Sequence, residues 1–226
     1  MPTRPEIVWL ASTEMADLEF FFDPVCPFAW LTSRWVDEVR TRRSYDVTWR
    51  FISLRMINRN LTADWYTPEY QAMHQAGLYG LRVADAARLA HGNDVVDGVY
   101  TAFGTAIHHD RRIEQLRDDP VAFSKDVLGV AGLPIDLAEA ALDESHDAYI
   151  QADSDLALER TGKDVGTPIL TFRPGAADEG SFFGPVISKV LRGEQALKLW
   201  DAVEVLATTP GMSELKRSDR AKLDFT

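Results

Sequence analysis

The sequence contains one cysteine, Cys26, which stands directly before a proline. Proline lacks the N–H that goes unpaired in the first turn of a helix, so Pro27 favours the first helical position. Cys26 would then lie at a helix N-terminus, beside unpaired backbone N–H groups and the positive end of the helix dipole. Both favour the thiolate, so the sequence predicts a nucleophilic cysteine with a pKa below its usual value of about 8.5.

A single thiol restricts the chemistry that Cys26 can perform. It cannot close an intramolecular disulfide, which argues against a disulfide-stabilised secreted scaffold. A mixed disulfide at Cys26 would need a second thiol molecule or another protein to resolve it. The competing interpretation is that Cys26 is an inert, small hydrophobic residue of the core.

A second motif, Val165-Gly166-Thr167-Pro168, leads into an apolar segment. A proline that opens a strand cannot donate to the ladder, so Pro168 is expected at a sheet edge or a bend. A cis bond before Pro168 would leave the backbone of Thr167 free to pair with an extended substrate. Because only about 5–6% of X–Pro bonds are cis, this motif alone is weak evidence.

The elements that must position these residues follow from the hydrophobic pattern. Residues 18–22 form a short apolar run that predicts a buried strand, and Leu31, Trp35 and Val39 then recur at helical spacing. Residues 45–54 alternate in part and predict a second strand. Together these segments predict a βαβ unit.

The remainder is predicted to be helical first and mixed at the end. Between about residues 62 and 162, helix caps and glycine stops recur without a clear strand. Strand signals return at 168–172 and 181–183, and an amphipathic helix follows over 196–207. This order predicts an α/β thioredoxin fold with a large helical insertion. The expected domains are a thioredoxin-like domain (1–61 and 162–226) and an inserted helical domain (62–161).

Composition and charge argue against several classes of partner. The formal net charge is −11, and such a surface repels phosphate backbones, so no nucleic acid is expected. No apolar run reaches the roughly 18 residues that span a bilayer, so no membrane association is expected. Residues 1–18 lack the pattern of a secretory signal, which favours a cytoplasmic location. The charged tail from Ser213 is expected to be loose.

Several segments together resemble one known family. Asp23-Pro24-Val25-Cys26-Pro27-Phe28, followed much later by Gly166-Thr167-Pro168, resembles the DsbA-like thioredoxin superfamily. Further segments are similar to the mycothiol-dependent nitroreductase family: 30–35, 53–54 with Asn58 and Asn60, 107–108, 182–189, 199–201 and 214–217.

The resemblance implies a cytosolic thioredoxin-fold oxidoreductase that takes electrons from mycothiol, a small cysteinyl-sugar thiol, and acts on a small electrophilic substrate. It also implies a homodimer and Thr167-Pro168 as a cis-proline loop beside the reactive sulfur. The sequence has no Gly-rich phosphate-binding loop, so no nucleotide and no other tightly bound cofactor is expected. The family carries a Cys-Pro-Trp-Cys motif, whereas this chain has Ala29 at the position of the second cysteine. A dithiol mechanism is therefore impossible, and a monothiol oxidoreductase is expected.

Other candidate site residues lie near the thiol in sequence or match the family. Pro27 and Phe28 are expected to bind substrate, and Asn58 either hydrogen-bonds a thiol ligand or caps a helix. Tyr66 and His108 are further candidates for the cleft, although a histidine such as His108 is more often a core residue. The pair that His108 forms with the next histidine does not predict a metal site, because neighbouring helical residues point in different directions.

Three functions compete at this stage. In the first, Cys26 forms a mixed disulfide with mycothiol or a similar thiol, and the protein is a thiol-dependent oxidoreductase. The second is an enzyme like the kappa-class glutathione transferases or the hydroxychromene carboxylate isomerases. Whether the small thiol is consumed as a reductant, conjugated to the product or returned unchanged would distinguish these enzymes from an oxidoreductase. The third is a non-catalytic thioredoxin-fold binding protein, which slow alkylation of Cys26 would favour.

Overall fold

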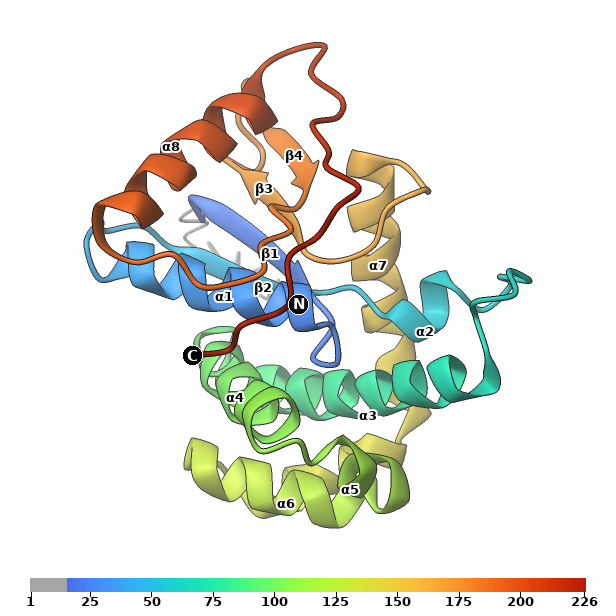
Figure 1. Cartoon of the computed structure of the whole chain (residues 1–226). Coiled ribbons are helices and arrows are strands. Elements are labelled where there is room, and N and C mark those ends of the chain that lie inside the picture. The colour runs from blue at the N-terminus through green and yellow to red at the C-terminus, as the bar shows by residue number, and fades with distance from the viewer. Residues whose placement is uncertain (1–15) are drawn as a thin grey trace, which may run out of the picture.

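Four strands form one mixed sheet in the computed structural model, which describes residues 16–226 (Figure 1). The order is β2 (Val47–Phe51), β1 (Leu18–Phe22), β3 (Ile169–Phe172) and β4 (Gly180–Phe183). Strand β1 is parallel to β2 and antiparallel to β3, and β3 is antiparallel to β4. The predicted thioredoxin fold is confirmed. Most of the segment expected to lack a secretory signal lies outside the described residues.

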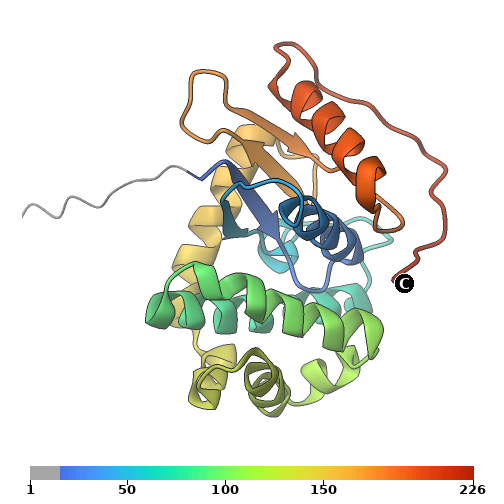
Figure 2. The ribbon, with the colours of Figure 1, turned by 90° about the vertical axis from the view of Figure 1, so that its left-hand side faces the viewer.

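Helices cover both faces of this sheet (Figure 2). Helices α1 (Pro27–Arg40) and α8 (Gly193–Thr208) pack together on one face, and α7 (Asp147–Thr161) packs on the other. Successive side chains of β1 point to opposite faces of the sheet. Phe20 and Phe22 join the main core, while Phe21 packs with Ala157 of α7. All three aromatic residues of β1 are therefore buried.

A helical layer lies against the end of the sheet where β1 leads into α1 (Figure 1). It contains α3 (Pro68–His91), α4 (Asp94–Gly104), α5 (Ile113–Asp118) and α6 (Pro120–Ala131). The π-helical turn η1 (Thr105–His109) continues α4, and the 3₁₀ turns η2 (Ile135–Leu142) and η3 (Glu144–His146) lead to α7. Because α7 contacts both the helical layer and the sheet, the division into two domains at residue 162 stays a prediction.

Two segments differ from the expected boundaries. The second strand ends at Phe51 rather than Leu54, because Ser53 caps the short helix α2 (Leu54–Ile57) through its side chain. The tail from Ser213 has no helix or strand, but Asp224 near its end forms an isolated bridge with Lys189. Within residues 16–226, no helix is long and apolar enough to cross a membrane.

Candidate active site

Cys26 is the N-cap residue of α1, the position expected from the sequence. Its sulfur accepts a hydrogen bond from the Ala29 N–H at 3.5 Å and donates one to the Thr167 carbonyl at 3.3 Å. Only a protonated thiol can donate, so this geometry belongs to the neutral form of Cys26. Cys26 as a residue is 8% exposed. The sulfur thus lies between the start of α1 and the loop that precedes β3.

The expected lowering of the Cys26 pKa is wrong for this conformation. Burial raises the pKa of the Cys26 thiol to about 12, because a thiolate would lose its solvation. The Ala29 and Phe28 N–H groups at the helix start oppose this shift, and a negative charge on Asp23 adds to it. Desolvation outweighs the helix N-terminus here, so a reactive thiolate requires better access of solvent to the sulfur.

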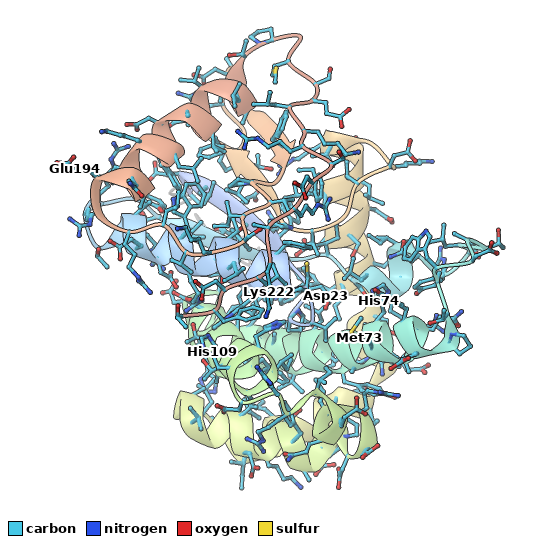
Figure 3. All side chains as sticks on the ribbon, viewed as in Figure 1. Asp23, Met73, His74, His109, Glu194 and Lys222 are labelled. Atoms are coloured by element: carbon cyan, nitrogen blue, oxygen red, sulfur yellow. The ribbon has the colours of Figure 1, made fainter. Side chains whose placement is uncertain are left out.

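Asp23 is a fully buried carboxylate beside the cysteine loop that the sequence analysis did not identify. Its oxygens accept hydrogen bonds from the Val25 N–H at 3.1 Å and the Leu54 N–H at 2.8 Å. Burial raises the pKa of Asp23 to about 7 in spite of these two hydrogen bonds. Gly77 of α3 makes room for it, since a Cβ at this glycine would lie 2.3 Å from an Asp23 oxygen. Figure 3 shows Asp23 between the sheet and α3.

Replacing Asp23 with asparagine is expected to make Cys26 easier to ionise above pH 7. In the wild-type protein, Asp23 becomes charged as the pH rises through about 7, and that charge raises the pKa of Cys26. Asp23→Asn removes the charge, so the alkylation rate of Cys26 should be several-fold higher at alkaline pH and little changed at acidic pH. The measurement is the rate of alkylation against pH, with the exposed Asp164→Asn as control.

The same variant also tests the pKa of Asp23 through stability. Because the folded pKa lies above that of the unfolded chain, the folded state binds more protons, and stability falls as the pH rises from about 4 to about 7. Asp23→Asn should lose this dependence, so its stability relative to wild type should improve over that window. A difference between the two proteins that is constant with pH would contradict the raised pKa.

Thr167 and Pro168 lie beside the sulfur, as the resemblance implied. The Thr167–Pro168 bond is cis, and both residues are buried. The Thr167 carbonyl accepts a hydrogen bond from the Cys26 thiol. The Thr167 hydroxyl donates a hydrogen bond to the Phe21 carbonyl at 3.1 Å and so connects this loop to β1. The carbonyl is therefore fixed against the thiol. A second cis bond, Gly184–Pro185, was not predicted.

His108 reaches the cysteine loop from the π-helical turn. Burial lowers its pKa to about 4, so the ring is neutral near pH 7 and its Nε2 donates to the Pro24 carbonyl at 2.9 Å. The ring also stacks on Trp30 and on Phe225, with centroid distances of 5.9 and 5.7 Å. His108 thus helps to position the segment that carries Cys26, a role between the two interpretations considered from sequence.

The remaining candidate site residues are Pro27, Phe28, Asn58 and Tyr66. Pro27 and Phe28 begin α1 and are both half-buried. Asn58 is the C-cap of α2, where its side-chain amide donates to the Leu54 carbonyl at 2.9 Å. Tyr66 is buried, and its hydroxyl lies 3.2 Å from Nδ1 of His74 on α3. The structure therefore joins Tyr66 and Asn58 to local partners and brings neither into hydrogen-bonding contact with Cys26.

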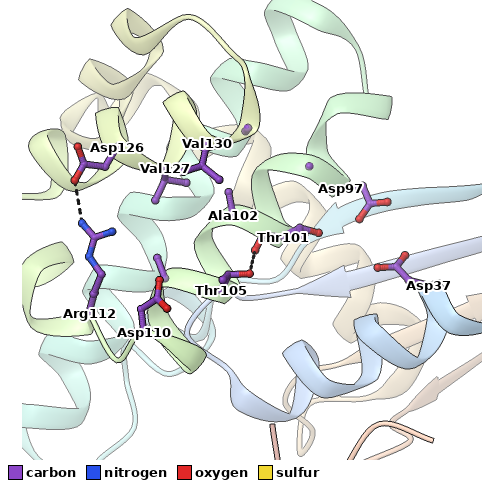
Figure 4. Close-up of a pocket in the computed structure, with 13 residues that line it drawn as sticks. Asp37, Asp97, Thr101, Ala102, Thr105, Asp110, Arg112, Asp126, Val127 and Val130 are labelled. Atoms are coloured by element: carbon purple, nitrogen blue, oxygen red, sulfur yellow. Dashed lines mark hydrogen bonds and ion pairs between the residues drawn. The ribbon is translucent and has the colours of Figure 1, made fainter. Parts of the chain in front are cut away.

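A groove of about 470 Å³ lies elsewhere, between α4 and α6 (Figure 4). Several acidic side chains line it, and Arg112 there pairs with Asp126 at 2.9 Å. Cys26 is not among its lining residues. The groove therefore does not mark the site of thiol chemistry.

Two comparisons of sequence decide the family. Residues 25–217 match the Rv2466c-like family, described as the mycothiol-dependent nitroreductase Rv2466c. The uncharacterized protein Rv2286c of Mycobacterium tuberculosis is 32% identical over 205 residues, which cover 90% of this chain and 82% of that protein. The chain belongs to the Rv2466c-like family.

Membership of the Rv2466c-like family indicates an enzyme of the thiol–disulfide oxidoreductase type, in which a small thiol takes part. The matched residues include Cys26, Thr167 and His108 and end before the last nine residues of the chain. The site described above therefore falls inside the part of the chain that the family shares.

Solved structures confirm the fold expected for the Rv2466c-like family. A "putative protein disulfide isomerase" from Nitrosomonas europaea has a TM-score of 0.54 at 15% identity, covering 84% of this chain and 97% of that one. The "probable DsbA oxidoreductase SCO1869" from Streptomyces coelicolor has a TM-score of 0.51 at 16% identity, covering 91% and 94%. At these identities the likeness shows the DsbA-like thioredoxin fold alone.

Proposed function

We propose that the protein is a thiol-dependent oxidoreductase that acts through Cys26 alone, with mycothiol as co-substrate and a small electrophile as acceptor. The observation that carries this proposal is the position of Cys26 at the N-cap of α1, with its sulfur 3.3 Å from the Thr167 carbonyl. The family, in which a small thiol is the reductant, supports the choice of mycothiol. Pro27, Phe28, Asn58 and Pro168 complete the proposed substrate-binding residues, with Tyr66 as a further candidate.

The electrons balance when two thiol molecules are used in each cycle. Cys26 and one thiol molecule each lose a proton as their sulfurs join in a disulfide bond, and the acceptor gains the two electrons and the two protons. A second thiol molecule then attacks the mixed disulfide, which releases the symmetric disulfide, and the proton of this second molecule passes to the Cys26 sulfur. Ala29 supplies no sulfur, so no internal disulfide forms at any step.

The conformation described above is a resting state in this proposal. The thiol is neutral and nearly covered, and its hydrogen bond to Thr167 favours the protonated form. Opening the site to solvent would reduce the desolvation that raises the pKa of Cys26. The Ala29 N–H would then stabilise the thiolate at the start of the helix.

A trapping experiment tests this function directly. The protein is incubated with the symmetric disulfide of mycothiol, and its intact mass is measured before and after free thiol is added. We expect the mass of one thiol to be added at Cys26, by exchange into a mixed disulfide, and then to be lost when free thiol resolves it. The chain unfolded in denaturant serves as control, because it reports the reactivity of an unprotected cysteine. An adduct in denaturant but none in the folded protein would contradict the proposal.

The burial of Cys26 favours a second candidate, a thioredoxin-fold binding protein in which the thiol is inert. A cysteine that is 8% exposed and has a raised pKa lies in the environment of an unreactive thiol. Alkylation as slow in the presence of substrate and thiol as in their absence would support this candidate. For an enzyme, the small thiol is consumed by a reductase, found in the product of a transferase, and returned unchanged by an isomerase.

A cytoplasmic location and a homodimer belong to the same proposal. A reducing compartment keeps a small thiol co-substrate reduced, which suits the reaction written above. The mycothiol dependence named for the family supports the location. The homodimer is an expectation from the resemblance alone.

A further inference from the structure

The C-terminal tail, residues 213–226, runs back over the face of the molecule that holds α1 and α8 (Figures 1 and 2). Its end is docked beside the π-helical turn. Phe225 stacks on the ring of His108 at a centroid distance of 5.7 Å and an interplanar angle of 15°. The Asp224 N–H donates to the Ser188 carbonyl at 2.8 Å. The end of the tail is thus held by an aromatic contact and a backbone hydrogen bond.

A second contact joins the tail to Phe28, which lies just after Cys26 in the sequence. The Arg220 guanidinium lies over the ring of Phe28, 5.2 Å from its centroid. Phe28 follows Cys26 by two residues, whereas His108, under Phe225, hydrogen-bonds the carbonyl of Pro24, two residues before Cys26. The tail therefore contacts the segment that carries Cys26 directly at Phe28, and indirectly, through His108, at Pro24.

These anchors are few, and the chain around them is exposed. All residues from 213 to 222 are exposed, and Leu215 is 74% exposed despite its apolar side chain. A segment with little buried apolar surface opens at low free-energy cost compared with the core. The family match ends at residue 217, before Arg220 and Phe225.

We propose that residues 213–226 are a strap that covers Cys26 in the resting protein and is released to admit the thiol and the acceptor. Release frees Phe28 and the face of His108 that stacks on Phe225, which opens the cysteine loop to solvent. The strap governs access to the sulfur. This proposal rests on the proposed function only because it takes Cys26 as the reacting thiol.

The test is the rate at which iodoacetamide alkylates Cys26, followed by intact mass. A chain that ends at Met212 lacks the whole strap, Phe225→Ala weakens the anchor at His108, and Arg220→Ala weakens the anchor at Phe28. We expect the shortened chain to react at least about tenfold faster than wild type, and each single variant to react about two- to fivefold faster. Leu215→Ala is the matched control, since it changes an exposed tail residue between α8 and the anchors and should react at the wild-type rate.

The outcome is decisive because the assay needs neither mycothiol nor an acceptor. Wild-type alkylation rates in the shortened chain and in Phe225→Ala, with circular dichroism showing both folded, would overturn the strap. If the shortened chain fails to fold, the two single variants decide, and wild-type rates in both would overturn it equally. Faster alkylation in a protein that forms no mixed disulfide would uphold the strap while removing the proposed function.

Discussion

Replacing Cys26 with serine is expected to lower thiol-dependent turnover by at least about 100-fold, because no other side chain can form the disulfide bond. The serine hydroxyl can still accept a hydrogen bond from the Ala29 N–H and donate one to the Thr167 carbonyl, so the fold should be preserved. The measurement is acceptor reduction at saturating thiol, with thermal unfolding of both proteins as the check on folding. Full activity in a folded Cys26→Ser protein would exclude Cys26 as the nucleophile.

A second substitution separates the monothiol mechanism from loss of activity in general. Ala29→Cys places a thiol three residues after Cys26, on the residue whose N–H donates to the Cys26 sulfur. We expect this variant to resolve its own mixed disulfide, so that the adduct with a single small thiol no longer accumulates. If the adduct persists as in wild type, the second thiol does not reach the first.

Replacing Gly104 with alanine is expected to destabilise the protein by about 2–3 kcal/mol, which lowers the melting temperature by roughly 5–10 °C. A Cβ at this glycine would lie 2.1 Å from the six-membered ring of Trp30. Trp30 cannot easily move, because it is 2% exposed, its Nε1 donates to His109, and Arg34 lies over its face at 4.3 Å. The loss should appear in thermal and denaturant unfolding.

Gly98 on the same helix supplies the control for that prediction. It is exposed, and a Cβ there would meet nothing within 4 Å. Gly98→Ala should leave stability unchanged or raise it by up to about 1 kcal/mol, since alanine is the better helix former. Equal effects at the two glycines would mean that contact with Trp30 does not determine the cost at Gly104.

Local signals in the sequence predicted much of the frame that holds the site. The apolar run of β1, the proline after Cys26 and the apolar spacing of α1 are patterns of residues close together in the sequence. Strand β1 and helix α1 are both found as predicted, with Cys26 as the N-cap of α1. The cis bond before Pro168 was expected from the family resemblance, because the short motif alone was weak evidence for it. The pairing of segments far apart in sequence was predicted only through the overall order of strands and helices.

The environment of the sulfur could not be predicted in this way, because it is set by packing between distant segments. Helix position alone predicts a lowered pKa for Cys26, yet burial against the loop at Thr167 reverses the direction. Asp23 looked like the end of a strand, and its buried carboxylate depends on the Leu54 N–H and on α3. The stack of His108 with Phe225 joins residues more than a hundred positions apart, for which a single sequence carries no signal.

The contact between Gly77 and Asp23 also has an evolutionary consequence. A carboxylate can occupy this buried position only while α3 presents no side chain there, since a Cβ at Gly77 would overlap it. The two positions therefore constrain each other: a side chain at 77 fits only with a smaller residue at 23 or with a shift of the side chain there. A sequence that keeps both residues also keeps the proton-binding group next to the cysteine loop.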